Sequence, residues 1–179
     1  ENNPVDYWQD TLFKLKIYRL LSFDKLVFLD ADMIVLQNLD HLFQYPHMTC
    51  TAAGQVLHND WIHLNSGLMV IEPNEEDYQA LQSLINPVCE KLIKAGHGFG
   101  DQDVITARFD AAWQLDMSRH LPEAYNVMLG YAGPLRKKGF IRSINDIYVY
   151  HFTGRQKPWR NHFREDVAIS LKIVKRGGG

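Results

Sequence analysis

Two aspartates, Asp30 and Asp32, interrupt an apolar run that extends from Leu26 to Leu36. Such a run, rich in β-branched and aromatic residues, is typical of a strand buried on both faces. Residues i and i+2 of an extended chain point to the same side, so the two carboxylates would lie close together. An unpaired buried carboxylate is very unfavourable. The pair therefore predicts a bound cation, and a hard divalent ion such as Mn²⁺ or Mg²⁺ suits carboxylate ligands best.

A second group of candidate residues follows later in the chain, where His151 precedes a short loop containing Gly154 and Lys157. Glycine lets backbone N–H groups approach a phosphate closely, and lysine offers it a positive charge. The segment Asp101-Gln102-Asp103 adds polar groups between these two regions. Each piece also has a structural explanation, since Asp101 suits the cap of a helix and a lone histidine is commonly structural. Their joint occurrence favours a site for a phosphorylated ligand.

The elements that must position these residues alternate between strand and helix patterns. We expect strands at 26–36, 51–54, 68–71, 115–117 and 147–150, and helices at 10–22, 74–86, 87–94 and from 101 onward. Residues 55–64 and 130–139 are expected to be loops. This alternation predicts an α/β fold with a Rossmann-like, mostly parallel sheet flanked by helices. Ligands of such sheets bind beyond the carboxyl ends of the strands, where Asp30, Asp32 and His151 would lie.

The bulk properties narrow the class of function. The chain has 179 residues and a formal net charge of −2, so neither nucleic acid nor an acidic membrane surface is expected as its partner. It contains no apolar stretch of the ~18 residues that a membrane span requires. Its two cysteines have neither metal spacing nor a disulfide framework, which favours a cytoplasmic location. The lumen of the secretory pathway is the alternative if an upstream anchor was removed.

Residues 1–176 are expected to form a single domain, followed by a glycine tail at 177–179. Val167, Leu171 and Val174 have helical spacing and predict an amphipathic helix before this tail.

Six segments together resemble the family 8 glycosyltransferases of the GT-A fold, the group that contains glycogenin and the bacterial lipopolysaccharide galactosyl- and glucosyltransferases. They are, in chain order, Phe13-Lys14-Leu15, FLDADMIV (28–35), NSGLMVIEP (65–73), GDQDVIT (100–106), LPEAYN (121–126) and HFTGRQKPW (151–159). They cover roughly residues 11–160. Each piece alone is common, whereas their combination in this order is highly specific.

The resemblance implies a retaining transfer of a hexose, glucose or galactose, from a UDP-sugar to a hydroxyl of a glycan or a protein-linked acceptor. It also implies that Mn²⁺, or Mg²⁺ in its place, is held by Asp30, Asp32 and His151. Breaking the glycosidic bond leaves negative charge on the diphosphate, and the metal, Lys157 and the Gly154 amide would stabilise that charge.

The resemblance further implies which residues meet the donor sugar. Lys14 would reach the phosphate or sugar, and the sugar contacts would come from Asn65, Ser66 and Gly67. Asp101 would bind sugar hydroxyls, and Gln102 would lie near the anomeric carbon. Because an amide is a poor nucleophile, we prefer a front-face mechanism in which the leaving phosphate assists the incoming hydroxyl.

The chain departs from the family pattern in two places. Family members begin with a strand that cradles the uridine several tens of residues before the aspartate pair, whereas 29 residues precede Asp30 here. That uridine-binding start is therefore expected to be missing. Tyr131 lies in the region of glycogenin's acceptor tyrosine, but not at a clearly matching position, so a separate acceptor is preferred to self-glucosylation. A homodimer is also considered.

Two other functions remain open. A haloacid-dehalogenase-like phosphohydrolase would use Mg²⁺, with Asp30 as nucleophile and Asp32 as acid/base, but it leaves the segments NSG and HFTGRQKPW unexplained. A non-catalytic remnant that binds UDP-sugars is the second, and the missing uridine-binding strand motivates it.

Overall fold

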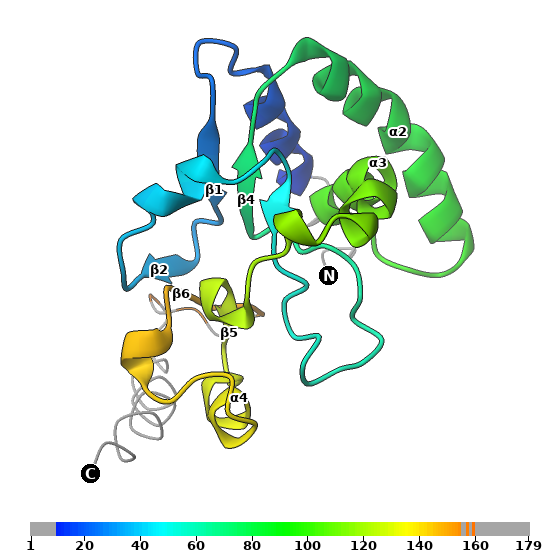
Figure 1. Cartoon of the computed structure of the whole chain (residues 1–179). Coiled ribbons are helices and arrows are strands. Elements are labelled where there is room, and N and C mark those ends of the chain that lie inside the picture. Colours follow the sequence, from blue (N-terminus) through cyan, green and yellow to red (C-terminus); the bar gives the residue numbers. More distant parts are fainter. Residues whose placement is uncertain (1–9, 155–156, 158, 160–179) are drawn as a thin grey trace.

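Figure 1 shows a computed structural model of the chain, which describes residues 10–154, 157 and 159. The helices are η1 (Asp10–Arg19), η2 (Asp40–Gln44), α2 (Glu75–Lys94), α3 (Asp101–Leu115), η3 (Met117–Arg119), η4 (Glu123–Tyr125), α4 (Ala132–Lys137) and η5 (Ile144–Asp146), where η marks a 3-10 helix. The strands are β1 (Leu26–Leu29), β2 (Met33–Val35), β3 (Thr49–Cys50), β4 (Leu68–Ile71), β5 (Val127–Met128) and β6 (Val149–His151).

Some of the predicted elements cannot be compared with the described part of the chain. The helix expected around Val167, Leu171 and Val174 and the tail 177–179 lie outside the described residues. Within the described part, no helix has the length and apolar character needed to cross a bilayer.

The described strands form two small sheets, with the strand orders β1-β4-β3 and β2-β6-β5. β4 pairs antiparallel with both β1 and β3, and β2 pairs antiparallel with β6, whereas β5 and β6 run parallel. The α/β class is as predicted, but the expectation of mostly parallel pairing is wrong for these strands. Parallel neighbours usually need a helical crossover, and no α-helix lies between β1 and β4 among the described elements.

β4 explains why one stretch of the sequence is apolar at every position. All four of its residues are fully buried, because the two faces of the strand contact different cores. Met69 and Ile71 pack in the core under η1, α2 and α3, and Leu68 and Val70 pack in a core on the other face with Tyr125. α2 and α3 lie against each other beside this sheet (Figure 1). The strand predicted at 68–71 is confirmed.

α2 begins where it was predicted and continues through the predicted break. Asn74 caps it by accepting the Asp77 N–H over 2.8 Å, and the helix ends at Lys94, before Gly96 with its φ of +75°. The expected restart of a second helix is wrong, because Pro87 lies inside one continuous helix. A proline in a helix interior costs about 3 kcal/mol. Apolar side chains before and after it pack on the core and offset that cost.

Other predicted boundaries also differ from the structure. The helix expected at 10–22 ends at Arg19, and the strand expected at 147–150 is β6 at Val149–His151. The strand expected at 51–54 lies two residues earlier, as β3. The strand expected at 115–117 is instead the end of α3 and the start of η3, where Leu115 and Met117 are 89% and 72% exposed. The loop expected at 130–139 contains α4, because Leu135 and Ala132 are buried against the second sheet.

Candidate functional site

Asp30 and Asp32 lie in the turn that connects β1 to β2. The Asp30 N–H donates to the Gly67 carbonyl over 2.8 Å, and the Met33 N–H donates to the Asp30 carbonyl over 3.1 Å. The expectation of one strand over 26–36, buried on both faces, is therefore wrong. β1 is half-buried and β2 is largely exposed. A turn of the chain, rather than strand alternation, presents the two carboxylates.

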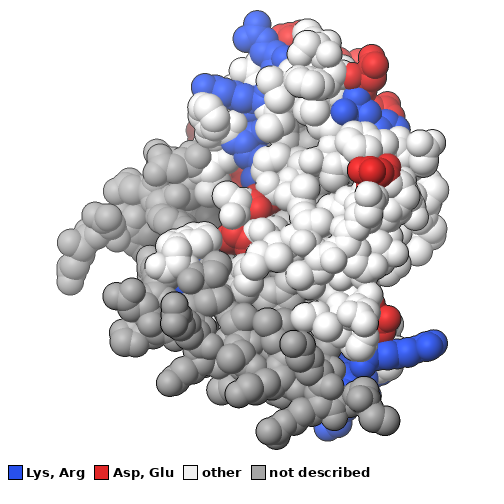
Figure 2. All heavy atoms as spheres, turned by 90° about the vertical axis from the view of Figure 1, so that its left-hand side faces the viewer, with Lys and Arg blue, Asp and Glu red and all other residues white. Residues whose placement is uncertain are grey.

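His151 reaches the aspartates because β6 pairs with β2 in a register that sets His151 opposite Met33. Its Nε2 atom lies 3.2 Å from Asp32 Oδ1 and 3.9 Å from Asp30 Oδ2. One ligand atom from each of the three side chains lies within 4.8 Å of the others. The structure thus brings together the three residues that the sequence analysis selected as metal ligands. Figure 2, which views the molecule from the left of Figure 1, shows acidic side chains near the centre of this face, with basic side chains above them.

Asn126 determines which nitrogen of His151 faces the aspartates, and the sequence analysis missed it. Asn126 is fully buried, and its Nδ2 donates to Asn65 Oδ1 over 2.7 Å. Its Oδ1 therefore faces His151 Nδ1, 2.9 Å away, and accepts a hydrogen bond from it. With the proton on Nδ1, Nε2 carries the lone pair that a metal ion needs. The one signal in the sequence was the place of Asn126 at the end of LPEAYN.

Gly67 makes room for this arrangement. A β-carbon at Gly67 would lie 2.9 Å from His151 Cε1 and 2.7 Å from Met33 Cε, which is closer than real side chains approach. The Gly67 N–H donates to Asn65 Oδ1 over 3.0 Å, and this fixes the Asn65 oxygen as the acceptor that orients Asn126. The loop before β4 therefore supports the candidate metal ligands through its backbone and its side chains.

The three side chains fit a divalent cation of the Mn²⁺ or Mg²⁺ type. Carboxylate oxygens favour hard cations, and the imidazole nitrogen extends the choice to transition metals. Although partial burial acts to raise it, the hydrogen bond and the positive charge of Lys157 help to hold the pKa of Asp32 well below its usual range. Asp32 is thus ionised at neutral pH and available as a ligand.

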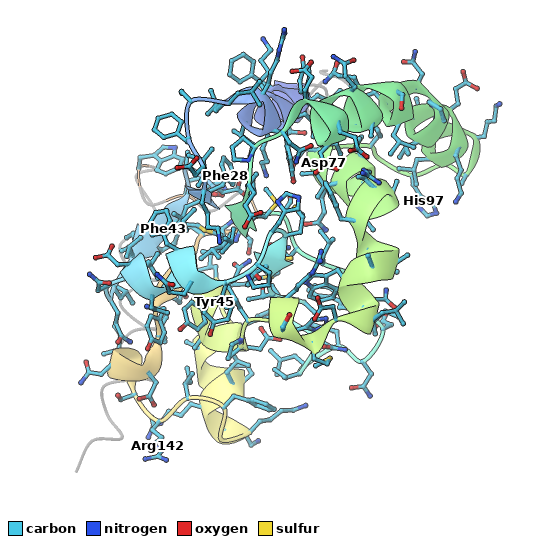
Figure 3. All side chains as sticks on the ribbon, turned by 45° about the horizontal axis from the view of Figure 1, so that its top comes forward. Phe28, Phe43, Tyr45, Asp77, His97 and Arg142 are labelled. Carbon is cyan, nitrogen blue, oxygen red and sulfur yellow. The ribbon has the colours of Figure 1, made fainter. Side chains whose placement is uncertain are left out.

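Lys14 joins one of these aspartates to the start of α3. Its side chain is only 12% exposed, and its Nζ atom lies 2.8 Å from Asp30 Oδ1 and 2.6 Å from Asp101 Oδ2. Figure 3 shows Phe28 beneath η1, and the same Nζ atom lies 5.2 Å from the centre of its ring. Lys14 is therefore a partly buried residue of the site and not a solvated surface lysine.

Burial and neighbouring charges shift the pKa values of Lys14 and Asp30. Burial acts to lower the pKa of Lys14, but the charges of Asp101 and Asp30 outweigh it and the pKa is raised. Burial also raises the pKa of Asp30, despite the opposing charge of Lys14. Asp101 does not cap α3, as was also considered, because Gly100 is the cap residue and Asp101 accepts a hydrogen bond from Ser66 Oγ over 2.9 Å.

Lys157 and Gly154 follow β6 in the loop where phosphate contacts were expected. Lys157 Nζ contacts the Asp32 carboxylate and donates to the Phe152 carbonyl over 2.7 Å. Gly154 has a φ of +79°, a conformation that favours glycine. The lysine therefore lies directly beside the candidate metal ligands.

A cavity of about 490 Å³ opens beside these residues. Its lining consists of Ala53, Asp60, Trp61, His63, Leu64, Asn65, Gln102, Met128, Tyr131 and Thr153. Asn65 supports the orientation of His151 through Asn126, and Gln102 Oε1 accepts the Ser66 N–H over 3.1 Å. The cavity thus adjoins both the metal-ligand group and the group around Lys14.

Comparison with solved structures defines the class of fold. The chain is similar to the galactosyltransferase LgtC in complex with donor and acceptor sugar analogues, with a TM-score of 0.63, 14% identity, and coverage of 99% of this chain and 74% of that one. The glycosyltransferase GlyE of Streptococcus pneumoniae TIGR4 gives a TM-score of 0.58, 21% identity, and coverage of 94% and 46%. The fold is that of glycosyltransferases, as the resemblance predicted.

The sequence comparisons place the chain more narrowly. The model of glycosyl transferase family 8 matches residues 57–162, more than half of the chain, and the chain belongs to this family. UDP-glucuronate:xylan alpha-glucuronosyltransferase 2 of Arabidopsis thaliana is 31% identical over 82% of this chain and 22% of its own length. Glycogenin-1 of Mus musculus is 32% identical over 83% of this chain and 41% of its own length. The chain spans less than half the length of these two relatives.

Proposed function

We propose that the chain transfers a hexose, with retention of configuration, from a UDP-sugar to a hydroxyl of a glycan or a protein-linked acceptor, and that Mn²⁺ supports the transfer. The observation that carries this proposal is the convergence of Asp30, Asp32 and His151 within 4.8 Å. The tautomer that Asn126 imposes on His151 supports it, because the lone pair of Nε2 faces the carboxylates. Membership of glycosyl transferase family 8 supports the reaction class.

The donor diphosphate would lie at the turn between β1 and β2. Asp30, Asp32 and His151 would hold Mn²⁺, which when bound neutralises charge that develops on the diphosphate as the glycosidic bond breaks. Lys157 adds a positive charge on the same side, since its ammonium lies against Asp32. The absence of a side chain at Gly154 allows a phosphate oxygen to approach the backbone N–H.

The donor sugar would lie between the loop before β4 and the start of α3. Ser66 and Asp101 are hydrogen-bonded to each other there and offer polar groups to sugar hydroxyls, while Lys14 holds their side of the site together. Gln102 Oε1 is engaged by the Ser66 N–H, so its amide positions the sugar and does not act as a nucleophile. The leaving phosphate would instead accept the proton of the incoming hydroxyl.

The charge of the cavity supports a neutral donor sugar. One relative is named for UDP-glucuronate. The cavity lining here includes the carboxylate of Asp60 and no Lys or Arg among the described residues. A uronate carboxylate in the cavity would be repelled by Asp60, because like charges in an interface are unfavourable. Lys14, at the side of the donor sugar, is already paired with Asp30 and Asp101. We therefore propose glucose or galactose as the transferred sugar.

Hydrolysis of the donor tests the proposed function. The chain is incubated with Mn²⁺ and UDP-glucose, UDP-galactose or UDP-glucuronate, and the released UDP is measured. We expect turnover of a neutral donor, and we expect Asp32→Ala and His151→Ala to abolish the Mn²⁺-dependent binding of UDP measured by calorimetry. His97→Ala is the matched control, because His97 lies exposed beyond the end of α2 (Figure 3). Full metal-dependent affinity in either site variant would contradict the ligand assignment.

The same assay separates the two alternatives. Binding of UDP with Mn²⁺ but without turnover would indicate a non-catalytic binding module. Turnover of a generic aryl phosphate without hydrolysis of any UDP-sugar would indicate a phosphohydrolase with Asp30 as nucleophile. The structure disfavours that role, because Lys14 Nζ lies 2.8 Å from Asp30 Oδ1 and occupies one of the two carboxylate oxygens.

A further inference from the structure

Three residues of the cavity lining, Trp61, His63 and Tyr131, have no part in the proposed donor site. We propose that they form an acceptor subsite for a neutral saccharide. In this subsite a pyranose ring packs against Trp61 and Tyr131, and one of its hydroxyls donates a hydrogen bond to His63 Nε2. The inference rests on the proposed function, because it names the acceptor class for the same reaction.

A buried carboxylate holds His63 in place. His63 Nδ1 lies 2.8 Å from Asp110 Oδ2, and Asp110 is 6% exposed whereas the His63 side chain is 59% exposed. Asp110 also accepts hydrogen bonds from the Leu64 N–H over 2.9 Å and from Gln114 Nε2 over 2.5 Å. Gln114 Nε2 also lies 3.2 Å from His63 Nδ1, but its shorter hydrogen bond is to Asp110. Since the carboxylate accepts from all of these groups, the proton of His63 lies on Nδ1. Nε2, on the other side of the ring, is the acceptor that His63 offers to a ligand.

An ordered group of rings forms the aromatic part of the cavity. His58 and Trp61 stack with their centroids 4.3 Å apart, and Trp61 and Tyr131 stack at 6.3 Å. His58 Nε2 and the Tyr131 hydroxyl are hydrogen-bonded over 3.0 Å. Trp61 nevertheless remains 40% exposed. Rings that are ordered before binding lose little entropy on binding, and they can pack against the flat C–H face of a sugar.

The loop that carries Trp61 is anchored to the rest of the site. Gly54 has a φ of +90°, and a β-carbon there would lie 2.6 Å from the Trp61 ring, so the indole requires a glycine at this position. Glu123 accepts the Gly54 N–H over 2.9 Å and the Val56 N–H over 3.3 Å. Because Glu123 belongs to the same LPEAYN segment as Asn126, one segment supports both the aromatic rings and the candidate metal ligands.

The polarity of the lining favours a neutral saccharide over other acceptors. Asp60 and His63 provide hydrogen-bond acceptors, and the lining contains no Lys or Arg among the described residues, so an anionic acceptor finds no counter-charge. A pyranose combines several hydroxyl donors with an apolar face, whereas a protein tyrosine brings one hydroxyl. Asn65 and Gln102 line the same cavity, so a saccharide bound there shares it with the proposed site of the donor sugar.

Binding, transfer and donor hydrolysis are measured separately to test the subsite. Maltohexaose and xylohexaose are the probes, and their binding is measured by calorimetry in the presence of UDP and Mn²⁺. We expect one of them to bind, and we expect Trp61→Ala and His63→Ala each to raise its Kd and its KM by about tenfold, the loss of one good contact. Hydrolysis of the UDP-sugar without acceptor should stay within about twofold of the wild-type rate, since these residues do not touch the donor.

Two exposed residues outside the cavity serve as controls. Phe43→Ala removes an aromatic ring on η2 that is 45% exposed, and His97→Ala removes an exposed imidazole; both residues are labelled in Figure 3. Neither variant should change saccharide binding or transfer. Trp61→Phe keeps an aromatic ring and should retain most of the affinity, so that loss in the alanine variant can be separated from misfolding.

The proposal is overturned if neither saccharide binds the wild-type chain, or if the Trp61→Ala and His63→Ala variants bind as the wild type does. Equal loss of transfer and of donor hydrolysis in folded variants also overturns it, because the residues would then act on the donor. Preferential transfer to a tyrosine peptide over both saccharides would also overturn the proposal. Absence of any UDP-sugar hydrolysis contradicts the proposed function instead, and the direct binding measurement still decides the subsite.

Discussion

His151 Nδ1 donates a hydrogen bond to Asn126 Oδ1 over 2.9 Å. Asn126 is itself oriented by the hydrogen bond of 2.7 Å that its Nδ2 donates to Asn65 Oδ1. Asn65 belongs to the loop that lies before β4 and lines the cavity. A single buried amide therefore couples the imidazole of the candidate metal site to the loop beside the proposed donor sugar. Residues that orient a metal-binding histidine in this way affect metal affinity without touching the metal.

We expect Asn126→Ala to weaken the binding of Mn²⁺ about 10- to 100-fold, which is the usual effect of losing such an orienting group. Without the acceptor at Oδ1, the proton of His151 is free to move to Nε2 and block the lone pair. The dissociation constant for Mn²⁺, measured by electron paramagnetic resonance, checks this expectation.

Asn126→Asp distinguishes orientation from simple packing. The aspartate keeps an oxygen acceptor for His151 Nδ1 but loses the donor to Asn65 Oδ1, so its Mn²⁺ affinity should lie between those of the wild type and the alanine variant. If both variants lose affinity equally, Asn126 acts by supporting the fold and not by orienting the imidazole.

Lys14→Met should lower the free energy of unfolding by about 3 kcal/mol, because it leaves the carboxylates of Asp30 and Asp101 without their shared cation. Adding Asp101→Asn to this variant should recover part of the loss, since it removes one of the two unpaired charges. Urea unfolding gives the free energies. Lys94→Met is the control, because the Lys94 side chain is 78% exposed and pairs only with Glu90 at the surface. Equal stability of Lys14→Met and the wild type would show that water screens these carboxylates.

The sequence predicted the residues whose type is unusual for their surroundings. Asp30 and Asp32 stood out because carboxylates interrupt an apolar run, and His151 stood out because it ends a strand before a glycine and a lysine. The structure brings these three together. Asn126 and the pair of His63 with Asp110 could not be found in this way, because the partners are 25 and 47 residues apart. Nothing local distinguishes them from other polar residues.

A helix or strand could be predicted where its own residues are enough to determine it. β4 is apolar at each position because both of its faces are buried, and α2 begins at Asn74 because the cap is local. The direction of strand pairing depends on the path of irregular segments such as 51–67, which have no periodic pattern. The continuity of α2 through Pro87 depends on tertiary packing that no local rule contains.

Gly54→Ala should destabilise the chain by about 1–3 kcal/mol, because alanine is strained at a φ of +90° and its β-carbon would meet the Trp61 ring. The indole must then move, so the emission spectrum of tryptophan should shift together with the fall in stability. Gly96→Ala is the matched control, since Gly96 has a φ of +75° but its β-carbon would meet nothing within 4 Å. It should lose stability without a change in emission. Unchanged emission in Gly54→Ala would mean that the loop absorbs the added methyl group.

His47 should make the stability of the chain fall as the pH is lowered. Its Nδ1 accepts the Glu72 N–H over 2.9 Å, and its Nε2 lies 3.3 Å from Asp77 Oδ2 without a hydrogen bond. Burial lowers the pKa of His47 despite the nearby charges of Asp77 and Glu72. The unfolded chain therefore binds a proton more readily than the folded chain, and the free energy of unfolding is lost as the pH falls below the ordinary histidine pKa of about 6.5. His47→Asn keeps an acceptor near Nδ1 but does not titrate. Urea unfolding at about pH 7.5 and 5.5 should show a smaller loss for this variant than for the wild type, and equal losses would mean that other groups control the acid sensitivity.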